Sequence, residues 1–362
     1  MRRAGLLLTL TGVLALLLTP SAHAFIYWAS SQDAKLARAS NDGTAVNKHF
    51  ISTGSLPFAV AVNSGHIYWA NQNSNTIGRA NIDGSGVDNN FISVPTPSGI
   101  ALTSSYIFWS SIDDSAVGRA NLDGSHRQRH LIPTDNPCGV AVDAGHVYWV
   151  QAAGTPSLIG RASFAGDNVT QNWVTIPGTS FPCGIAVNTA NIFWTDSGFL
   201  GGGTNIGRAN TSTGMGADAS TIGDASTPCG AAVRSTHLYW ANAGTNTIGR
   251  ARTDSTGVNQ SFVHTGGNQV CGVAVDSFGF PETTIDGATI RGRKRKATFE
   301  FSASDPGSTF TCRLDDRDYR GCSSPKTYTR LHKGTHTFRV KAKSPQGAID
   351  PTAAKRTFTI KR

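Results

Sequence analysis

The sequence predicts an all-β protein, a six-bladed β-propeller followed by a small β-sandwich, and three observations support this prediction. Glycine supplies 40 of 362 residues and charged residues only 15%, a composition typical of turn-rich β structure. An aliphatic-aromatic-Trp triplet recurs six times at spacings of 40 to 46 residues, the period of propeller repeats. Residues 281–362 lack tryptophan and contain runs in which polar and apolar residues alternate.

Residues 1–24 have the pattern of an export signal. Arg2 and Arg3 precede an apolar run of about 13 residues, and Ala22-His23-Ala24 forms a small-x-small cleavage site. We therefore expect a mature chain that starts at Phe25. The apolar run is shorter than the roughly 20 residues of a membrane span, so we expect a secreted, extracellular protein without one. That compartment permits disulfides.

Each repeat within residues 25–280 contains four strand-like runs. The first bears the triplet that ends in Trp28, Trp69, Trp109, Trp149, Trp194 and Trp240. The second supplies an arginine: Arg38, Arg79, Arg119, Arg161, Arg208 and Arg250. The third is short and apolar, as in Phe50-Ile51, and the fourth is of the type Gly184-Ile-Ala-Val187. Four short strands in each of six repeats make six four-stranded blades.

The turns and the phase of the repeat predict how the ring is built. Asp42-Gly43, Asp83-Gly84 and Asp123-Gly124 are good two-residue hairpin turns, because glycine accepts a positive φ. The mature chain begins with a Tyr-Trp strand, whereas the last repeat ends with the run that normally precedes one. We therefore expect Gly272–Val275 to be the innermost strand of the blade whose second strand is Phe25–Ala29. The ring then closes between the termini and leaves no free edge.

These motifs resemble the YWTD repeat of low-density lipoprotein receptor class B domains. Arg119–Ser125 and Phe193–Asp196 match that pattern closely, and the resemblance covers about residues 25–276. Only Trp194-Thr195-Asp196 has the full Thr-Asp ending, and no cysteine-rich module follows. In that family the six-bladed propeller is a binding and scaffolding unit, so the resemblance implies binding rather than catalysis.

Residues 281–362 are predicted to form one small β-sandwich. Cys312 and Cys322 flank a Leu-Asp-Asp hairpin, and Gly334-Thr-His-Thr-Phe338 follows. The segment resembles the immunoglobulin-like modules appended to bacterial exported proteins. The expected domains are thus a signal peptide (1–24), a propeller (25–280) and an immunoglobulin-like β-sandwich (281–362).

The net charge of +9 resides in the C-terminal segment, since residues 281–362 carry +10 and residues 1–280 carry −1. The only glutamates are Glu282 and Glu300, so the propeller offers none as a catalytic base or a metal ligand. The run Arg291–Lys296 either binds an anionic surface or acidic glycan, or protects a strand edge. We expect no nucleic-acid partner, because no cluster of aromatic residues offers a stacking platform.

Two recurring residue types invite a functional interpretation. His66, His146 and His237 precede the aromatic strand in alternate repeats, an approximately threefold arrangement that suggests three zinc ligands. Ring geometry should hold them more than about 10 Å apart, whereas zinc ligands lie at about 2.1 Å, so we predict no metal and no cofactor. The six arginines could form a ligand ring, but a feature repeated in every blade favours a structural role.

The six cysteines fall into two groups. Cys312 and Cys322 should form a disulfide across their hairpin. Cys138, Cys183, Cys229 and Cys271 share one repeat position, just before the inner strand. Neighbouring inner strands should be about 7 Å apart there, the upper limit for bridged Cα atoms. The four are either paired as Cys138–Cys183 and Cys229–Cys271, or buried as free thiols.

The predicted function is that of an exported binding or adhesion module for a glycan or a protein. The links between blades and the loops after the Trp strands share one face, and two of those loops, 150–158 and 195–205, break the period. The candidate ligand-binding residues there are Phe181, Asp196, Phe199 and Leu200. The alternatives are a metal-assisted lyase or hydrolase with its site at the channel mouth, and a structural envelope component.

Overall fold

The computed structural model describes residues 24–152, 154–178, 181–197, 202–267, 269–276, 281, 283–303, 307–343, 349–350 and 353–361. Within these ranges the regular structure consists of strands apart from one short 3-10 turn, η1 (Gly292–Lys294). The all-β prediction is confirmed. None of these segments forms a helix long and apolar enough to cross a membrane. The predicted signal peptide lies, up to residue 23, outside the described residues.

The first 24 strands form six antiparallel sheets of four strands each. The first sheet has the order β24-β1-β2-β3, with β24 (Val270–Val275), β1 (Phe25–Ser30), β2 (Lys35–Ser40) and β3 (Asn47–Ser52). The second comprises β4 (Pro57–Val62), β5 (His66–Asn71), β6 (Thr76–Asn81) and β7 (Asp88–Ser93). The third comprises β8 (Pro97–Leu102), β9 (Tyr106–Ser111), β10 (Ala116–Asn121) and β11 (Gln128–Pro133).

The remaining three sheets of this ring repeat the same order. The fourth comprises β12 (Pro137–Val142), β13 (His146–Gln151), β14 (Leu158–Ser163) and β15 (Thr170–Thr175). The fifth comprises β16 (Pro182–Val187), β17 (Asn191–Asp196), β18 (Asn205–Asn210) and β19 (Asp218–Ile222). The sixth comprises β20 (Pro228–Arg234), β21 (His237–Asn242), β22 (Thr247–Arg252) and β23 (Asn259–His264).

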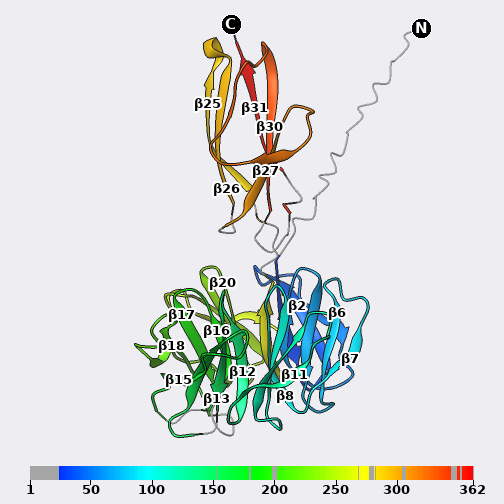
Figure 1. The fold of residues 1–362 in the computed structure, drawn as a ribbon, viewed down its shortest axis with the longest axis vertical. Coiled ribbons are helices and arrows are strands. Elements are labelled where there is room, and N and C mark those ends of the chain that lie inside the picture. Colours follow the sequence, from blue (N-terminus) through cyan, green and yellow to red (C-terminus); the bar gives the residue numbers. More distant parts are fainter. Residues whose placement is uncertain are drawn as a thin grey trace, which may run out of the picture.

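The first strands of these sheets contact one another in a closed circle, so the sheets form a β-propeller, which Figure 1 shows from the side. The circle runs through β24, β4, β8, β12, β16, β20 and back to β24. β24 pairs with β1 through Ile26↔Val275, Tyr27↔Ala274 and Trp28↔Val273. The predicted closure between the two ends of the sequence is therefore confirmed.

The Gly-Arg motif makes room for the tryptophans. Trp69 lies opposite Gly78 in the register of β5 and β6, and the other repeats pair in the same way. A Cβ built on Gly78 would lie 2.2 Å from Cε2 of Trp69. The six tryptophan side chains of the triplets are fully buried. The first sheet has Ala37 opposite Trp28, in place of glycine.

The arginines of the motif pack against aromatic rings. The guanidinium of Arg79 lies 4.0 Å from the centroid of Phe91, and that of Arg161 lies 3.4 Å from the centroid of Trp173. Arg119 lies over Tyr106 and donates to the carbonyl oxygen of Phe164, which belongs to the next sheet. Such stacking is a cation–π contact. These contacts favour the structural role over a ligand ring.

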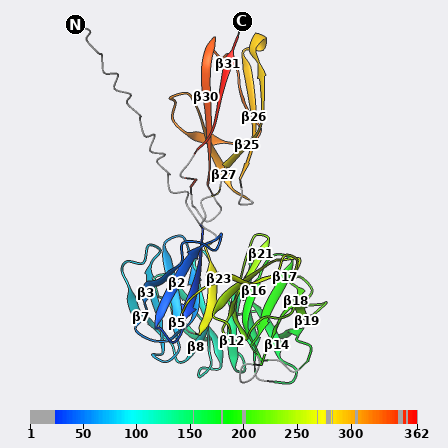
Figure 2. The same cartoon turned by 180° about the vertical axis from the view of Figure 1, so that it is seen from behind.

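The C-terminal strands form two further sheets. One has the order β25 (Thr283–Arg291), β26 (Lys296–Ala303), β29 (Lys326–Tyr328), and the other has β28 (Arg320–Cys322), β27 (Thr309–Leu314), β30 (Gly334–Lys343), β31 (Ala354–Ile360). They share one core, in which Phe299 and Phe338 stack at 4.2 Å. Figure 2 shows these strands as a body separate from the propeller.

The propeller has two different faces. We name the face where the six innermost strands begin, at residues 57, 97, 137, 182, 228 and 270, the loop face. The opposite turn face carries the Asp-Gly turns, in which Gly43, Gly84 and Gly124 have φ of 88°, 92° and 82°. The positive φ of the glycine is as expected, but the two-residue hairpin prediction is wrong, because six residues separate the paired strands, as 41–46 do between β2 and β3. Because β24 runs from the loop face to the turn face, the chain leaves the propeller on the turn face (Figure 1).

Candidate binding site at the channel mouth

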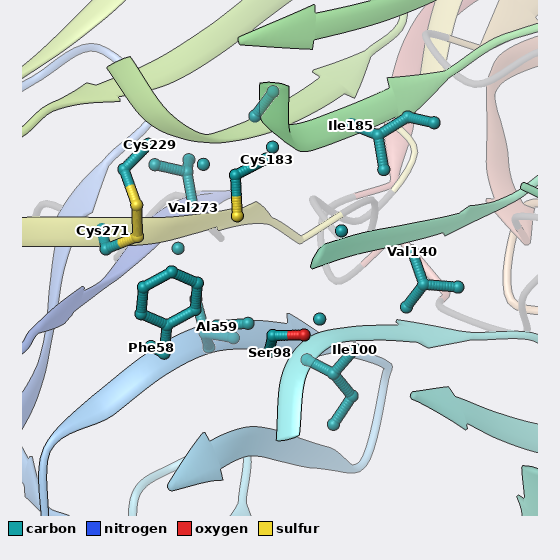
Figure 3. A pocket seen from close by; sticks show the side chains of 17 residues that line it. Phe58, Ala59, Ser98, Ile100, Val140, Cys183, Ile185, Cys229, Cys271 and Val273 are labelled. Atoms are coloured by element: carbon teal, nitrogen blue, oxygen red, sulfur yellow. A yellow bond between two sulfur atoms is a disulfide. The ribbon is translucent and has the colours of Figure 1, made fainter. Parts of the chain in front are cut away.

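The central channel of the propeller is almost filled. Glycines of the innermost strands let neighbouring strands approach so closely that added side chains would collide. A Cβ on Gly272 would lie 2.6 Å from Cα of Ala59, and one on Gly230 would lie 2.7 Å from Cα of Gly272. The remaining cavity measures about 50 Å³ (Figure 3). Sites for organic ligands occupy at least roughly 300 Å³, so this cavity suits a few water molecules.

Disulfides join neighbouring innermost strands at the loop-face end of the channel. Cys138 of β12 bonds Cys183 of β16, and Cys229 of β20 bonds Cys271 of β24, each with Cα atoms 5.0 Å apart. This is the paired alternative of the sequence analysis rather than free thiols. The separation is shorter than the expected 7 Å because the glycine after each cysteine allows the close approach. The predicted Cys312–Cys322 bond is also present.

An apolar cluster covers the mouth of the channel. Phe58 of β4 occupies the repeat position that cysteines fill in four other sheets, and its ring points toward the Cys229–Cys271 disulfide (Figure 3). Phe58 and Phe181 both pack against Cys138, Cys183 and Ala152. We name these five residues the mouth cluster. Its members come from the second, fourth and fifth sheets and from the links beside them.

Of the four predicted ligand-binding residues, Phe181 belongs to the mouth cluster and Asp196 contacts Phe181. Phe181 is partly buried rather than fully exposed, because its ring packs against the disulfide. Asp196 Oδ1 accepts a hydrogen bond from the Phe181 backbone N–H at 3.1 Å, and Ser197 Oγ donates to the Phe181 carbonyl at 2.9 Å. Asp196 therefore positions Phe181. Phe199 and Leu200 lie outside the described residues.

Sequence reasoning missed Phe58 as a member of the site. The repeat alignment contained a signal, because the cysteine column reads Phe58, Ser98, Cys138, Cys183, Cys229 and Cys271. A large ring in a column of small residues must either fill the channel or lie over its mouth. Ser98 instead donates to the Pro137 carbonyl at 2.9 Å and so links two innermost strands.

The three histidines of the zinc interpretation lie in separate sheets, each against the tyrosine of its own strand. Ring centroids are 6.0 Å apart for His66 and Tyr68 and 6.4 Å for His237 and Tyr239. Burial, and then the nearby Arg79, lowers the pKa of His66. Among the residues with described positions, no group of three or more His, Cys, Asp or Glu side chains could hold a metal ion.

Comparisons with known proteins relate the chain to others by fold alone. No family model and no curated protein matches the sequence. A chain of the nidogen/laminin complex aligns with 70% of this chain and 98% of its own length, at 19% identity and a TM-score of 0.59. Virginiamycin B lyase from Staphylococcus aureus gives 18% identity over 79% of this chain and 94% of its own, with a TM-score of 0.49. A gluconolactonase from Xanthomonas campestris gives 13% identity over 75% of this chain and 91% of its own, with a TM-score of 0.46.

Proposed function

We propose that the protein is exported and that its six-bladed, YWTD-like propeller binds a protein or a glycan with the loop face. The C-terminal strands form an immunoglobulin-like sandwich in this proposal. The ligand contacts the mouth cluster and the loops around it. Phe58 and Phe181 are the apolar centre of the contact, and Asp196 holds Phe181 in place.

The observation that supports this proposal is the mouth cluster itself. Its two phenylalanines are partly buried and lie over a channel too narrow for an organic ligand. Leu56, beside Phe58, is 39% exposed and extends the apolar surface. A polar side chain lies next to it, since Ser31 Oγ donates to the carbonyl of Pro57, the residue before Phe58, at 3.0 Å. An apolar centre within a polar rim is the usual anatomy of a binding interface. The likeness to a chain of the nidogen/laminin complex agrees with binding, because that chain belongs to a protein complex.

The test replaces both rings of the mouth cluster. The unchanged protein is first screened against a glycan array and a panel of purified extracellular proteins. For the ligands that it binds, Phe58→Ala with Phe181→Ala should weaken binding by at least tenfold. The reason is that central aromatic residues carry most of the binding energy of an interface. The matched control is Val46→Ala with Val87→Ala, two turn-face valines that are 37% and 44% exposed. Equal binding by the two variants would place the site elsewhere.

We also propose that the C-terminal unit attaches the protein to an acidic polysaccharide. Its β25–β26 hairpin is joined to a second loop, since Arg295 Nε donates to the Leu331 carbonyl at 2.5 Å and Leu331 N–H donates to the Arg295 carbonyl at 3.0 Å. This contact gathers a set of exposed cations that we name the basic tip: Arg291, Arg293, Lys294, Arg295, Arg330, Lys333 and Lys361. Such a field attracts polyanions.

Immobilised heparin serves as the polyanion probe for the basic tip. Changing Arg293, Lys294 and Arg330 to glutamine should lower the salt concentration needed for elution. The control changes Arg320, Lys343 and Lys355 to glutamine, which removes the same charge at other places on these sheets. Elution at the same salt concentration for both variants would mean that net charge alone acts. Stronger binding to anionic vesicles than to heparin would favour a lipid surface instead.

A further inference from the structure

The hairpin between the first and second strands is capped in the same way in four sheets. The residue after the innermost strand accepts hydrogen bonds from the backbone N–H groups two and three positions later. The acceptor and donor sets are Asn63 with Gly65 and His66, Thr103 with Ser105 and Tyr106, Asp143 with Gly145 and His146, and Asn188 with Ala190 and Asn191. The second donor of each set is the residue directly before the aliphatic-aromatic-Trp triplet.

The first sheet completes the same cap with residues from opposite ends of the sequence. Asp276 follows β24 and takes the acceptor position, and Phe25 takes the position of the second donor. Phe25 N donates to Asp276 Oδ1 at 2.9 Å, and Asp276 N donates to the Phe25 carbonyl at 3.0 Å. Tyr27 Oη donates to Asp276 Oδ2 at 3.3 Å, as Tyr148 donates to Asp143 Oδ2 at 2.8 Å in the fourth sheet.

The hydrogen bonds and cations around the Asp276 carboxyl group do not offset the cost of burying its negative charge. Its residue is 4% exposed, and burial raises its pKa to about 6, against the lowering effects of the Phe25 N–H, Arg234, Tyr27 and Arg38. Asp143, at the same repeat position, has a lowered pKa, because hydrogen bonds led by the Gly145 N–H outweigh its own burial. A cation next to Asp276 would therefore be stabilised more than one next to Asp143.

We propose that the Ala24–Phe25 bond is the processing site and that the amine released from Phe25 forms a buried ion pair with Asp276, which locks the closed ring. The proposal rests on the export signal included in the proposed function. Water hydrolyses the amide bond. The Ala24 carboxylate leaves with the signal peptide, and the Phe25 amine takes up a proton. The only new group within the fold is the ammonium, and its nitrogen is the atom that lies 2.9 Å from an oxygen of Asp276 in the uncleaved chain.

Processing changes how stability depends on pH. In the uncleaved chain the pKa of Asp276 is raised above its unfolded value of 3.8, so the stability contributed by its protonated form is lost as pH rises from about 4 to about 6. The ammonium favours the carboxylate and removes that loss. The pKa of the amine is raised in turn above its ordinary value of about 7.7–8.0, so the pairing is lost when pH rises through the raised value. Arg38, Arg234 and Tyr27 face the same carboxyl group and are present in both chains.

Removal of Ala24 also costs stability, and the test must separate this loss from the gain due to the ion pair. Ala24 is 4% exposed, and its carbonyl accepts a hydrogen bond from Asn41 N at 2.8 Å. The experiment therefore compares residues 25–362 with residues 23–362, each with Asp276 or with Asp276→Asn. At pH 7 the chain that starts at Phe25 should melt about 3–6 °C higher than the longer one. The Asp276→Asn change should abolish this difference, and so should a pH well above the amine pKa.

Asp143→Asn is the matched control, since Asp143 caps an uninterrupted hairpin. It should lower the melting temperature equally in both chains. A difference between the chains that survives Asp276→Asn, or none with Asp276 present, overturns the proposal. If Asp276→Asn does not fold, the proposal is tested by acetylating the Phe25 amine of residues 25–362 with acetic anhydride. Reaction that needs a higher pH than in a free peptide supports the ion pair, and reaction at the rate of a free peptide refutes it. A secreted chain that mass spectrometry finds to start elsewhere than at Phe25 also refutes it.

Discussion

Single positions of the repeat are set by direct contact between neighbouring strands. The Gly-Arg motif was predicted to be structural, but sequence reasoning did not assign the glycine a role. Its role depends on the register, which places Gly78 opposite the indole of Trp69. A contact of this kind follows from which residues face each other, and the repeat period alone does not give that.

Replacing such a glycine should overpack the interior. We expect Gly78→Ala to lower the free energy of unfolding by about 1–3 kcal/mol, because its Cβ would lie 2.2 Å from Cε2 of Trp69. The natural Ala37 opposite Trp28 indicates that a methyl group can be admitted, so the cost should fall in the lower part of that range. Urea unfolding followed by tryptophan fluorescence measures it.

A turn glycine with open surroundings is the control for this prediction. A Cβ on Gly145 meets nothing within 4 Å, so Gly145→Ala should be neutral or stabilise by up to about 1 kcal/mol. Equal losses for the two variants would mean that contact with the tryptophan does not explain the glycine at position 78.

At the scale of strands, the sequence predicts which segments pair but not how closely the sheets approach. The four runs of each repeat became the four strands of each sheet, because period and turn residues are local signals. The 5.0 Å spacing of the bridged Cα atoms was not predicted. It depends on glycines at matching heights of five innermost strands that are distant in sequence, with Ala59 at that height in the sixth.

The two propeller disulfides should differ in what they protect. The bonded residues are 42 or 45 positions apart, so loop-closure entropy alone predicts a loss of about 4 kcal/mol for either pair of Cys→Ala changes. Cys229–Cys271 also holds β24, the strand that closes the ring. We therefore expect faster hydrogen exchange at Val273 and Ala274 when Cys229 and Cys271 are replaced, and little change there when Cys138 and Cys183 are replaced. Similar exchange in both variants would contradict this role.

For the whole molecule, the phase of the repeat was enough to predict closure, whereas the filled channel was not predicted. Closure follows from counting, since one repeat is divided between the two ends of the chain. The state of the channel depends on the Phe58 side chain and on strand spacing, neither of which has a periodic signal. The sequence therefore named Phe181 as a candidate but not Phe58, which packs against the same buried cluster.

Closure makes the stability of the entire propeller depend on its last strand. A chain that ends at residue 269 lacks β24, whose Val270, Val273 and Ala274 are buried, and it exposes the edge of β1. Burial of each large apolar side chain contributes about 1.5–3 kcal/mol, and the total stability of a domain is only about 5–15 kcal/mol. With Cys229→Ala in both chains, the version ending at residue 269 should lose cooperative melting, while the version ending at residue 280 should keep it. Equal melting temperatures would show that the ring is held by five sheets without the strand that joins its ends.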